Sequence, residues 1–429
     1  MTNKDTQTAI SLTEMCGDSM VKMQYYGPNS LNEDGTFIPF SEQMAIISHY
    51  LHNEGTIYEK TYKKKALGLI DDIYKAKCRN EEGKVADYNE AQQYNLFSEL
   101  YNVPFRPHRE SKFIFIDLFA GIGGFRIACQ NIGGKCVFSS EWDHNAQKTY
   151  AYNFGEIPFG DITSKAIKNM IPAKFDLLCG GFPCQAFSIA GYQKGFEDTR
   201  GTLFFDVADI IKKHRPKAVF LENVKNLKGH DKGNTFKVIK KTLEDLNYVV
   251  YDKVMNAMEY ANVPQNRERI FIVCFDLEQV PNHDKFTFPE EQELKASIHS
   301  CIETNENNPK LFYGEDMKHY EELKSSIQSK DTIYQWRRVY VRENKSNVCP
   351  TLTANMGTGG HNVPLILTDD GIRKLSPKEC LNFQGFPSNY QFPPYIAMSA
   401  CYKQAGNSVV VPLIQKVCQQ ICTIISENS

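Results

Sequence analysis

The chain has 429 residues, 41% of them hydrophobic and 23% charged, which is typical of a globular protein with one large core and a smaller part. No apolar run approaches the ~18 residues that cross a bilayer, and the N-terminus lacks the basic start and apolar run of a signal peptide, so we expect a cytoplasmic protein. The net charge of −2 excludes a general attraction to nucleic acid, so a DNA partner would need positive charge gathered on one face.

The thirteen cysteines are odd in number and show no paired spacing. Cys418 and Cys422 lie one helical turn apart, but no CxxC pair and no histidine cluster completes a zinc site. We therefore expect no metal, and reduced thiols that are mostly buried as small hydrophobic side chains.

Residues 1–110 differ from the rest of the chain and predict a helical N-terminal extension followed by a linker. Apolar residues recur at helical spacing over 40–77, with a break near Asn53 to Gly55. Lys60 to Lys65 form a basic cluster, for which a solvated surface is a simpler interpretation than a DNA contact. Two prolines and mixed charge in "NVPFRPHRESK" indicate the linker.

Between Lys112 and residue 275, short apolar runs alternate with amphipathic stretches. This alternation predicts an α/β fold with a doubly wound, mainly parallel sheet. The expected strands are 113–119, 135–142, 175–181, 217–224, 249–257 and 267–275, and the expected helices are 124–133, 144–154, 202–214 and 233–248.

The alternation stops after about residue 276. Residues 276–370 are polar and irregular, with short strands, and the glycine-rich stretch 356–380 has the character of a hairpin. Residues 404–427 predict a strand or turn that leads into a long amphipathic helix.

A glycine-rich loop follows the first expected strand, in "IDLFAGIGGF". Gly121 and Gly123 would let the backbone approach a ligand at the start of a helix, and Glu141 after the next strand is placed to bind ribose hydroxyls. The spacing is not GxGxxG, so a nucleoside cofactor without a pyrophosphate fits better than a dinucleotide, with Phe119 and Trp142 as apolar walls. The alternative is a tight turn that binds nothing.

Cys184, in "GGFPCQAFS", follows the carboxyl end of another expected strand, where open α/β sheets bind ligands. A thiolate there is a strong nucleophile, although a lone cysteine is more often a packing residue. Glu222 in "FLENV" lies at a further strand end, where burial would raise its pKa and let it share a proton. The alternative for Glu222 is a hydrogen-bonded cap of the strand.

Arg267 and Arg269 alternate at the start of the last expected strand, and a period of two places both on one face. Two guanidinium groups on one face suit a carbonyl, a carboxylate or a phosphate. The alternative is surface ion pairing with Glu268 and its neighbours.

Seven motifs of the chain resemble, in the same order, those of the bacterial cytosine-5 DNA methyltransferases of restriction–modification systems: "FIDLFAGIGGFR", "GGFPCQAFS", "GTLFFDV", "LENVKNL", "QNRERIFIV", "RKLSPKECLNFQGFP" and "AGNSVVVP". The resemblance runs from about Lys112 to about Val417. The helical N-terminal extension (1–110) lies outside it. For the rest, the resemblance implies three parts: a catalytic and cofactor-binding domain with the S-adenosylmethionine-dependent methyltransferase fold (111–275), a smaller irregular β-rich target-recognition domain (276–370), and a C-terminal segment that completes the recognition hairpin and the catalytic domain (371–429).

The resemblance also implies roles for the site residues. Cys184 matches the nucleophile that adds to carbon 6 of cytosine, so that carbon 5 can attack the methyl group of S-adenosylmethionine. Glu222 matches the residue that bonds ring N3 and the exocyclic amine. Arg267 and Arg269 match the arginine pair that lines the cytosine pocket, with Arg269 nearer the base carbonyl. The cofactor pattern falls on Phe119, Gly121, Gly123, Glu141, Trp142, Asp161, Ile162, Leu203 and Asn407.

Such an enzyme must rotate its target base out of the duplex, and the loop after Cys184 is long enough to close over DNA. Ala190 in this loop stands where some relatives carry serine, so the residue that fills the vacated space is not identified. Base reading is expected within 276–370, where half or more of the candidate side chains could instead contact phosphate alone. The candidates are Trp336, Arg337, Arg338, Arg342, Asn344, Lys345 and Asn355.

The resemblance therefore implies methylation of cytosine within a short, specific duplex DNA site, by an enzyme that is monomeric on DNA. This methylation would protect the DNA from a restriction endonuclease that shares the site and need not bind the enzyme. One alternative is the same reaction on structured RNA such as tRNA. Another is a methyltransferase whose N-terminal region also acts as a transcriptional repressor.

Overall fold

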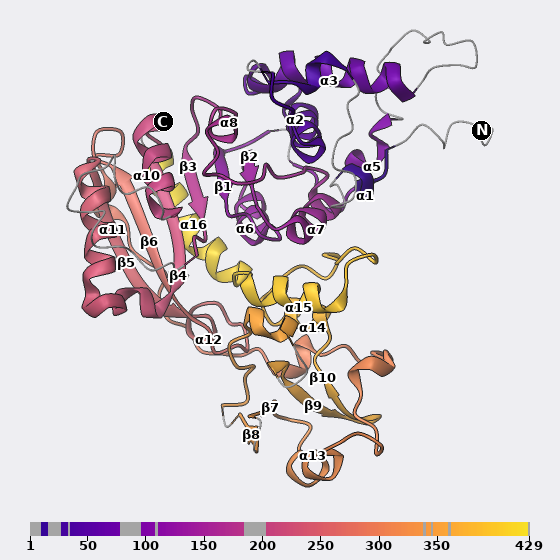
Figure 1. Ribbon diagram of the computed structural model, residues 1–429. Helices are drawn as coiled ribbons and strands as arrows, with labels where there is room; N and C mark the ends of the chain where they lie inside the picture. The colour runs from indigo at the N-terminus through magenta and orange to yellow at the C-terminus, as the bar shows by residue number, and fades with distance from the viewer. Residues whose placement is uncertain are drawn as a thin grey trace. The chain divides into compact units, whose positions relative to one another are not determined.

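A computed structural model of the protein describes residues 10–15, 27–32, 35–77, 96–107, 110–183, 203–337, 340–344, 346–358 and 362–427. The chain divides into two compact units, residues 1–219 and residues 220–429 (Figure 1). The first unit joins the N-terminal helices to three parallel strands, and the second joins further strands of the α/β core to a small antiparallel sheet.

The strands of the first unit are β1 (Phe113–Leu118), β2 (Gly134–Ser140) and β3 (Leu177–Gly180), in the order β2-β1-β3 and all parallel. Most of their side chains are buried, as in parallel strands that are covered on both faces. In the register of β1 with β3, Leu118 lies opposite Gly180, so the two strands end at the same level. The loops that follow them therefore leave from one edge of the sheet.

Four described helices of this part are α6 (Gly124–Asn131), α7 (His144–Phe154), α8 (Lys165–Lys168) and α10 (Leu203–His214). Local chemistry explains the bounds of α7. The Asp143 carboxylate accepts hydrogen bonds from the backbone N–H groups of Asn145 and Ala146, which caps the start of the helix. Gly155 adopts a left-handed φ of 67°, which ends it.

The N-terminal residues form α1 (Leu12–Met15), the 3-10 turn η2 (Pro28–Ser30), α2 (Phe40–Asn53), α3 (Glu59–Lys77) and α5 (Ser98–Tyr101). The break expected near Asn53 to Gly55 is confirmed, because α2 ends at Asn53 and Gly55 has a left-handed φ of 75°. Of the 14 residues of α2, 11 are buried. Since α2 contacts both α3 and β2, it is covered on nearly all sides.

A buried ion pair joins α6, β2 and α2. Arg126 Nη1 of α6 donates to Glu156 Oε1 at 2.6 Å, and Ser139 Oγ of β2 donates to the same oxygen at 2.8 Å. His49 Nε2 of α2 lies 3.5 Å from that oxygen. Burial alone would raise the pKa of Glu156, but the Arg126 guanidinium and two histidines lower it to about 2, so the carboxylate is ionised.

The second unit contains β4 (Ala218–Val224, which begins in the first unit), β5 (Tyr248–Asn256) and β6 (Glu268–Asp276), in the order β4-β6-β5. β5 and β6 are antiparallel, with Tyr248 opposite Asp276. Their connection is short and contains only α12 (Ala257–Tyr260), which suits an antiparallel pair because parallel strands need a longer crossover. α11 (Asn234–Asp245) contacts β5.

A separate antiparallel sheet has the order β10-β9-β7-β8, with β7 (Tyr334–Trp336), β8 (Val341–Glu343), β9 (Leu365–Thr368) and β10 (Gly371–Lys374). β9 and β10 form a hairpin with a two-residue turn, which confirms the hairpin expected in 356–380. Leu323 of α13 (Tyr320–Ser326) and the following Ile327 pack with Tyr334, Leu365 and Ile372 into the core of this sheet.

The remaining elements are three helices and six 3-10 turns: α14 (Pro377–Asn382), α15 (Met398–Asn407), α16 (Val411–Ser426), η3 (Lys225–Lys228), η4 (His230–Gly233), η5 (His283–Lys285), η6 (Ile298–Cys301), η7 (Pro309–Leu311) and η8 (Ala354–Thr358). The stretch Met398–Ser426 is long and apolar enough to cross a membrane by length and composition alone. It consists of two helices, and 56% of its most apolar window is buried in the protein, as in a core helix.

The predicted α/β class is confirmed, and each strand and helix expected between residues 113 and 276 is present. The ten described cysteines are free and nine of them are buried, in line with their expected packing role. In the C-terminal part, a turn rather than a strand precedes the predicted long helix. The predicted domain boundaries at residues 110, 275 and 370 stay a prediction.

Replacing Arg126 with Met should lower the free energy of unfolding by about 3–5 kcal/mol, because Glu156 would remain buried without its main counter-charge. Urea unfolding followed by circular dichroism measures this change. The control is Lys63→Met, which removes an exposed ion pair with Glu59 at the surface of α3 and should leave the urea midpoint unchanged. Equal effects of the two substitutions would contradict the role of the buried pair.

Candidate active site

The glycine-rich loop after β1 has an unusual backbone. Phe119, Gly121 and Gly123 all have left-handed φ values, of 55°, 55° and 82°. For Phe119 such a value is strained, and strained residues concentrate at functional sites. A Cβ on Gly123 would lie 2.2 Å from the Phe154 ring, so this glycine is needed for packing, whereas Gly121 has only the Phe119 carbonyl oxygen near it, at 4.0 Å. The space over Gly121 therefore suits a ligand that approaches the backbone.

Glu141 follows β2 and joins it to this loop. Its Oε2 accepts from Gly121 N at 2.8 Å, and its Oε1 accepts from Asp143 N at 2.8 Å. Burial raises the pKa of Glu141, and these backbone N–H groups oppose the rise. Each carboxylate oxygen retains a second lone pair that could accept from a ribose hydroxyl. The next residue, Trp142, is 78% exposed, so its indole face is open to a flat ring.

A short segment runs beside β2, where Phe159 pairs with Ser140 in a parallel bridge. Asp161 and Ile162 lie on the loop that follows this segment. The exposed Asp161 carboxylate accepts from Thr163 N at 2.9 Å, and Ile162 is buried. This region thus offers carboxylate acceptors, an aromatic face and an open glycine. That set of groups fits a nucleoside cofactor and contains no phosphate-binding cation.

The other two expected cofactor residues lie at helix ends. Leu203 begins α10 in the first unit and is half-buried. Asn407 is the exposed last residue of α15 in the second unit.

Asp117, within β1, is a buried acid that the sequence analysis did not single out. Its side chain is fully buried, and burial raises its pKa to about 8, although the Arg126 guanidinium opposes the rise. The only sequence signal was one acid inside an apolar strand, just before the glycine-rich loop. At neutral pH its carboxyl is therefore largely protonated.

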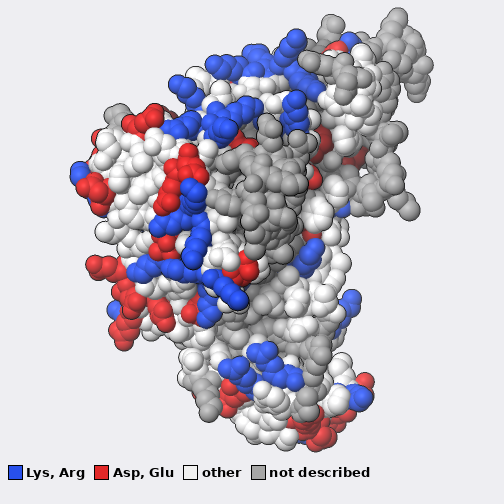
Figure 2. All heavy atoms as spheres, turned by 60° about the vertical axis from the view of Figure 1, so that its left-hand side comes forward, with Lys and Arg blue, Asp and Glu red and all other residues white. Residues whose placement is uncertain are grey.

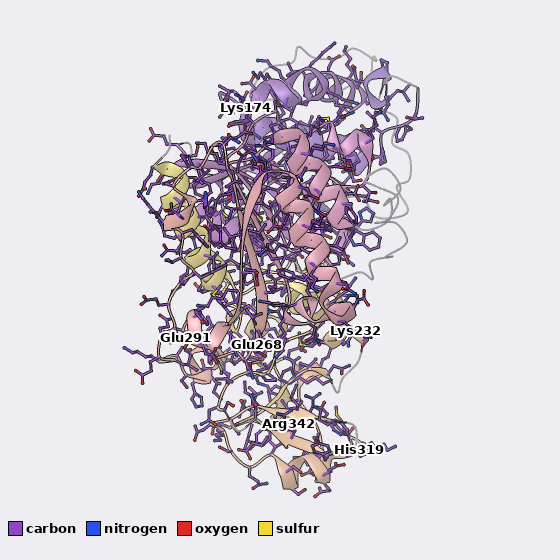
Figure 3. The ribbon with its side chains drawn as sticks, turned by 90° about the vertical axis from the view of Figure 1, so that its left-hand side faces the viewer. Lys174, Lys232, Glu268, Glu291, His319 and Arg342 are labelled. Carbon is purple, nitrogen blue, oxygen red and sulfur yellow. The ribbon has the colours of Figure 1, made fainter. Side chains whose placement is uncertain are left out.

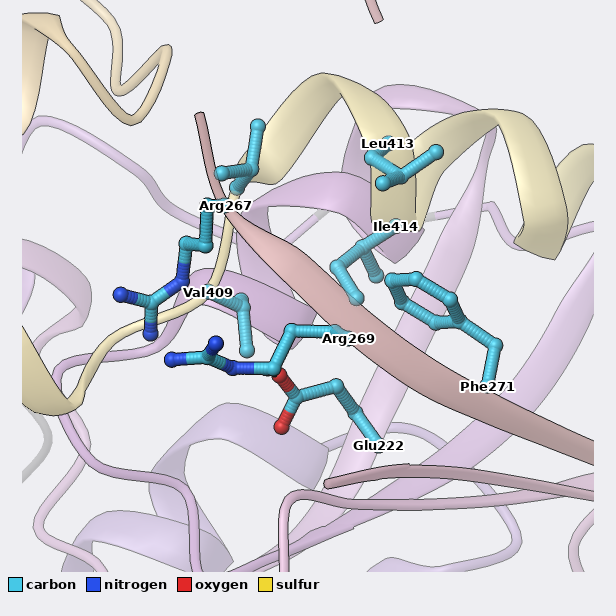
Figure 4. A pocket seen from close by; sticks show the side chains of 8 residues that line it. Glu222, Arg267, Arg269, Phe271, Val409, Leu413 and Ile414 are labelled. Carbon is cyan, nitrogen blue, oxygen red and sulfur yellow. Dashed lines mark ion pairs between the residues drawn. The ribbon is translucent and has the colours of Figure 1, made fainter. Parts of the chain in front are cut away.

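In the second unit, the structure brings Glu222, Arg267 and Arg269 together in the lining of one pocket (Figure 4). Glu222 comes from β4 and Arg269 from β6, and Arg267 directly precedes β6. Apolar side chains complete the lining: Phe271, Val409, Val410, Leu413 and Ile414. The pocket therefore combines a charged group with walls that exclude water.

Arg269 and Glu222 form an ion pair in this pocket, with Nε 3.0 Å from Oε1. Burial raises the pKa of Glu222, and Arg269 and then Arg267 oppose the rise. Burial therefore favours the protonated form of this carboxyl, and the two guanidinium groups favour the ionised form. The structure thus provides the physical condition that was expected for Glu222.

Arg267 has different partners from Arg269, although both lie on the expected face. Its Nη1 donates to the carbonyl oxygen of Leu352 at 2.7 Å, and its Nη2 donates to those of Gly406 at 3.3 Å and Ser408. Burial lowers the pKa of Arg267 to about 9. In Figure 4 its guanidinium lies apart from the Glu222 carboxylate. Arg267 therefore fixes main-chain segments around the pocket, which no sequence signal indicated.

Cys184 and Ala190 lie outside the described residues, which stop at Pro183 and resume at Leu203. Of the candidates for DNA recognition, Arg338 and Lys345 also lie outside them. The role expected of these residues stays a prediction.

Four described candidates for DNA recognition lie on or next to the antiparallel strands β7 and β8: Trp336, Arg337, Arg342 and Asn344. Arg342 of β8 is exposed and lies opposite Gln335, and Arg337 Nη2 donates to Gln335 Oε1 at 3.0 Å (Figure 3). These side chains share one face of the two strands. Trp336, on the other face, packs against the core of the small sheet and meets the His319 ring edge-on, with centroids 5.0 Å apart.

Two further candidates differ in exposure. Asn344 is half-buried, and its side-chain amide donates to the Val348 carbonyl oxygen. Asn355, within η8, is exposed. Among the described candidates, Arg337, Arg342 and Asn355 thus have exposed side chains.

Positive charge in the first unit gathers on α3. Figure 2 shows Lys and Arg side chains clustered at the top of the molecule, the level of α3 in Figure 1. Lys60, Lys63 and Lys64 are exposed there, and Lys63 pairs with Glu59 at 2.6 Å. A DNA contact by this cluster stays a prediction.

The fold is of the α/β class, with acidic side chains near strand ends: Glu141 after β2 and Glu222 in β4. The family model "C-5 cytosine-specific DNA methylase" matches residues 113–423. The chain therefore belongs to this family, and it is a cytosine-5 DNA methyltransferase of the restriction–modification type.

Relatives that are named type II methyltransferases match most of the chain. The type II methyltransferase M.Bsp6I of Bacillus sp. (strain RFL6) is 49% identical over 309 residues, which is 71% of this chain and 96% of the relative. M.HpaII of Haemophilus parainfluenzae is 47% identical over 346 residues, 77% of this chain and 94% of the relative. M.HhaI of Haemophilus parahaemolyticus is 43% identical over 324 residues, which is 72% of this chain and 93% of the relative.

Solved structures agree on the fold. The Entamoeba histolytica methyltransferase EhMeth matches with a TM-score of 0.55 and 18% identity, covering 73% of this chain and 98% of that chain. The S. pombe Dnmt2 methyltransferase matches with a TM-score of 0.54 and 16% identity, and the match covers 75% of this chain and 99% of that chain. These identities are low and show the fold alone, which is the methyltransferase fold that was predicted.

Replacing Asp117 with Asn should change how stability depends on pH. The folded-state pKa of about 8 lies above the usual value of 3.8, so folded wild type retains a proton that the unfolded chain releases. Wild-type stability should therefore fall relative to Asp117→Asn between about pH 4 and pH 8, by up to about 1.4 kcal/mol per pH unit. Urea unfolding without cofactor at pH 5, 6, 7 and 8 measures the difference. A difference that stays constant over this range would mean that Asp117 titrates normally.

Proposed function

We propose that the enzyme methylates carbon 5 of a cytosine within a short, specific duplex DNA site, with S-adenosylmethionine as the methyl donor. The observation that carries the assignment is the buried Glu222 carboxyl, which has a raised pKa and is held by Arg269 in a partly apolar pocket. A carboxyl whose pKa is raised shares a proton with a neutral heterocycle more readily than an unperturbed carboxyl does.

In the proposed mechanism, the Cys184 thiolate adds to carbon 6 of the cytosine, and the electron pair of the 5,6 double bond moves toward carbon 5. Glu222 gives its proton to ring N3, or shares it, and so neutralises the charge that the addition creates. S-adenosylmethionine, when bound, supplies an electrophilic methyl group on a sulfonium centre. After methylation, the carbon-5 proton is lost to solvent, the bond between Cys184 and carbon 6 breaks to release the thiolate, and ring N3 returns its proton to Glu222, which restores the ring and the enzyme.

The two arginines take different parts in this proposal. Arg269 uses Nε for Glu222 and donates from Nη1 to the Glu268 carbonyl oxygen at 2.8 Å. We assign its Nη2 to the carbonyl oxygen of the base. Arg267 is a positioning residue, because its guanidinium already bonds three main-chain carbonyl groups.

The proposed cofactor residues follow from the chemistry of the loops in the first unit. Glu141 would accept from the ribose hydroxyls, and the exposed Trp142 and Phe119 would cover the adenine. Gly121 and Gly123 would allow close approach of the backbone, and the remaining members of the set are Asp161, Ile162, Leu203 and Asn407.

The proposed reaction requires a base that has been rotated out of the duplex, at a cost of a few kcal/mol. Residues 276–370 would read the site, with the exposed Arg337 and Arg342 as the described candidates for base contacts. We propose that methylation protects DNA from a restriction endonuclease with the same site, and that the enzyme acts in the cytoplasm as a monomer on DNA.

Replacing Cys184 with Ala should abolish methyl transfer, because no other group could then form the bond to carbon 6. The measurement is transfer from labelled S-adenosylmethionine to duplex DNA, with tRNA as a second substrate. Wild type should also form a denaturation-resistant adduct on duplex DNA with 5-fluorocytosine at the target, since fluorine cannot leave as a proton does. Cys184→Ala should form none while still binding the cofactor.

Two results would contradict this scheme. Turnover by Cys184→Ala would exclude the covalent route. Labelling of tRNA without labelling of duplex DNA would replace the DNA substrate by structured RNA.

Replacing Glu222 with Gln should slow methyl transfer by about 10²–10⁴-fold, because an amide cannot give a proton to ring N3. The single-turnover rate on duplex DNA measures the effect without product release. Glu268→Gln is a matched control, since Glu268 begins β6 but its half-exposed side chain pairs with Lys225. A near-wild-type rate for Glu222→Gln would remove the proposed role.

A further inference from the structure

The family match begins at residue 113, so it assigns no role to the N-terminal extension. The described helices of that extension, α2 and α3, contact a part of the first unit that lies between two proposed cofactor loops. This part is the segment 157–160, which leads from α7 to Asp161. Phe159 N donates to Ser139 O at 2.9 Å, and Glu141 N donates to Phe159 O at 2.7 Å. The segment is therefore fixed along β2, next to Glu141 at one end and Asp161 at the other.

Side chains of α2 bind the backbone of this region directly. Ile157 N donates to Ser48 Oγ at 3.0 Å, and Gly160 N donates to Glu42 Oε1 at 2.8 Å. Ser139 N in β2 donates to His49 Nε2 at 3.1 Å. Buried backbone N–H groups require such acceptors, and the extension supplies them for the buried Ile157 and Ser139 and also for the part-buried Gly160.

Rings of the extension also enclose the side chain of Phe159. The His49 ring lies 4.6 Å from the Phe159 ring and the Tyr62 ring 6.3 Å from it, centroid to centroid. Tyr62 of α3 also donates its hydroxyl to the Val137 carbonyl oxygen at 2.7 Å. Phe159 is 1% exposed, so α2 and α3 complete the core beneath the segment.

Glu42 is the acceptor nearest to the proposed cofactor residues, because Gly160 directly precedes Asp161. The Glu42 carboxyl packs closely against Gly160, because a Cβ at that position would lie 2.6 Å from Glu42 Oε1. Burial raises the pKa of Glu42 to about 7, and the Gly160 N–H opposes the rise. A neutral amide oxygen at the same place would therefore be a close substitute for this group.

We propose that α2 of the N-terminal extension positions the cofactor site, and that Glu42 fixes the Gly160 amide and with it Asp161 and Ile162. This inference rests on the proposed function, in which those two residues hold the nucleoside of S-adenosylmethionine. Glu42 is a positioning residue, because it acts through the backbone of the loop and touches no reacting group.

The test compares full-length variants in equilibrium binding of S-adenosylmethionine and in steady-state methyl transfer. Glu42→Ala leaves the Gly160 N–H without its acceptor and should weaken cofactor binding about tenfold. The kcat at saturating cofactor should change less than about twofold, because only a binding contact is loosened. Glu42→Gln should bind like wild type, since its amide oxygen can accept the same hydrogen bond.

Ile47→Val is the control for a purely structural effect. Ile47 is buried on the side of α2 away from Glu42, so its truncation should lower the melting temperature and leave cofactor binding unchanged. Should Glu42→Ala not fold, Glu42→Asp gives the same test, because it shortens the acceptor by one methylene and should also weaken binding relative to Glu42→Gln.

Three outcomes would overturn the inference. Wild-type binding by both Glu42→Ala and Glu42→Asp would show that the contact does not position the loop. If Ile47→Val weakens cofactor binding in proportion to the stability that it loses, then the weaker binding of Glu42→Ala reflects a general loss of structure and not a positioning contact. If the wild-type protein itself does not bind S-adenosylmethionine, the proposed function fails and the inference fails with it. This result differs from failure of the inference alone, in which wild type binds the cofactor and the Glu42 variants bind it equally well.

Discussion

A single buried carboxylate, that of Glu156, organises the first unit. It accepts hydrogen bonds from Arg126 on the helix after the glycine-rich loop and from Ser139 on the strand that leads to Glu141. His49 from the N-terminal extension lies against it. Because an unpaired charge in a protein interior is strongly unfavourable, Arg126 must stay with Glu156, and His49 packs beside the pair as a neutral ring whose Nε2 accepts from Ser139 N. The arrangement therefore links both proposed cofactor loops to an element outside the family match.

The pocket of the second unit uses buried charge in a different way. Glu222 forms an ion pair with Arg269 and its pKa is raised, whereas Glu156 accepts from Arg126 and Ser139 and its pKa is lowered. Burial thus favours the protonated form of the Glu222 carboxyl, and the hydrogen-bonded guanidinium keeps Glu156 ionised. The two buried acids therefore differ in the direction of their pKa shift.

Much of this organisation could be predicted from the sequence, because it depends on local patterns. Apolar runs and glycine positions predicted the core strands, and strand ends predicted the neighbourhood of Glu141 and of Glu222. Partners distant in the chain could not be predicted. Arg267 and Arg269 share a period of two, yet Arg267 bonds the Gly406 carbonyl oxygen, 139 residues away. Likewise, no local pattern distinguishes Glu42 from the acids of a solvated helix, since only tertiary packing brings Gly160 to it.

The positions of the two tryptophans have a practical consequence. Trp142 is exposed beside the loop of Glu141 in the first unit, and Trp336 packs in the small sheet of the second unit with its indole Nε1 buried. Fluorescence from the former should therefore respond to quenchers and to occupancy of the neighbouring loops, and fluorescence from the latter to melting of the small sheet. The native chain thus carries one optical reporter in each unit, and replacing either indole with phenylalanine would separate their signals.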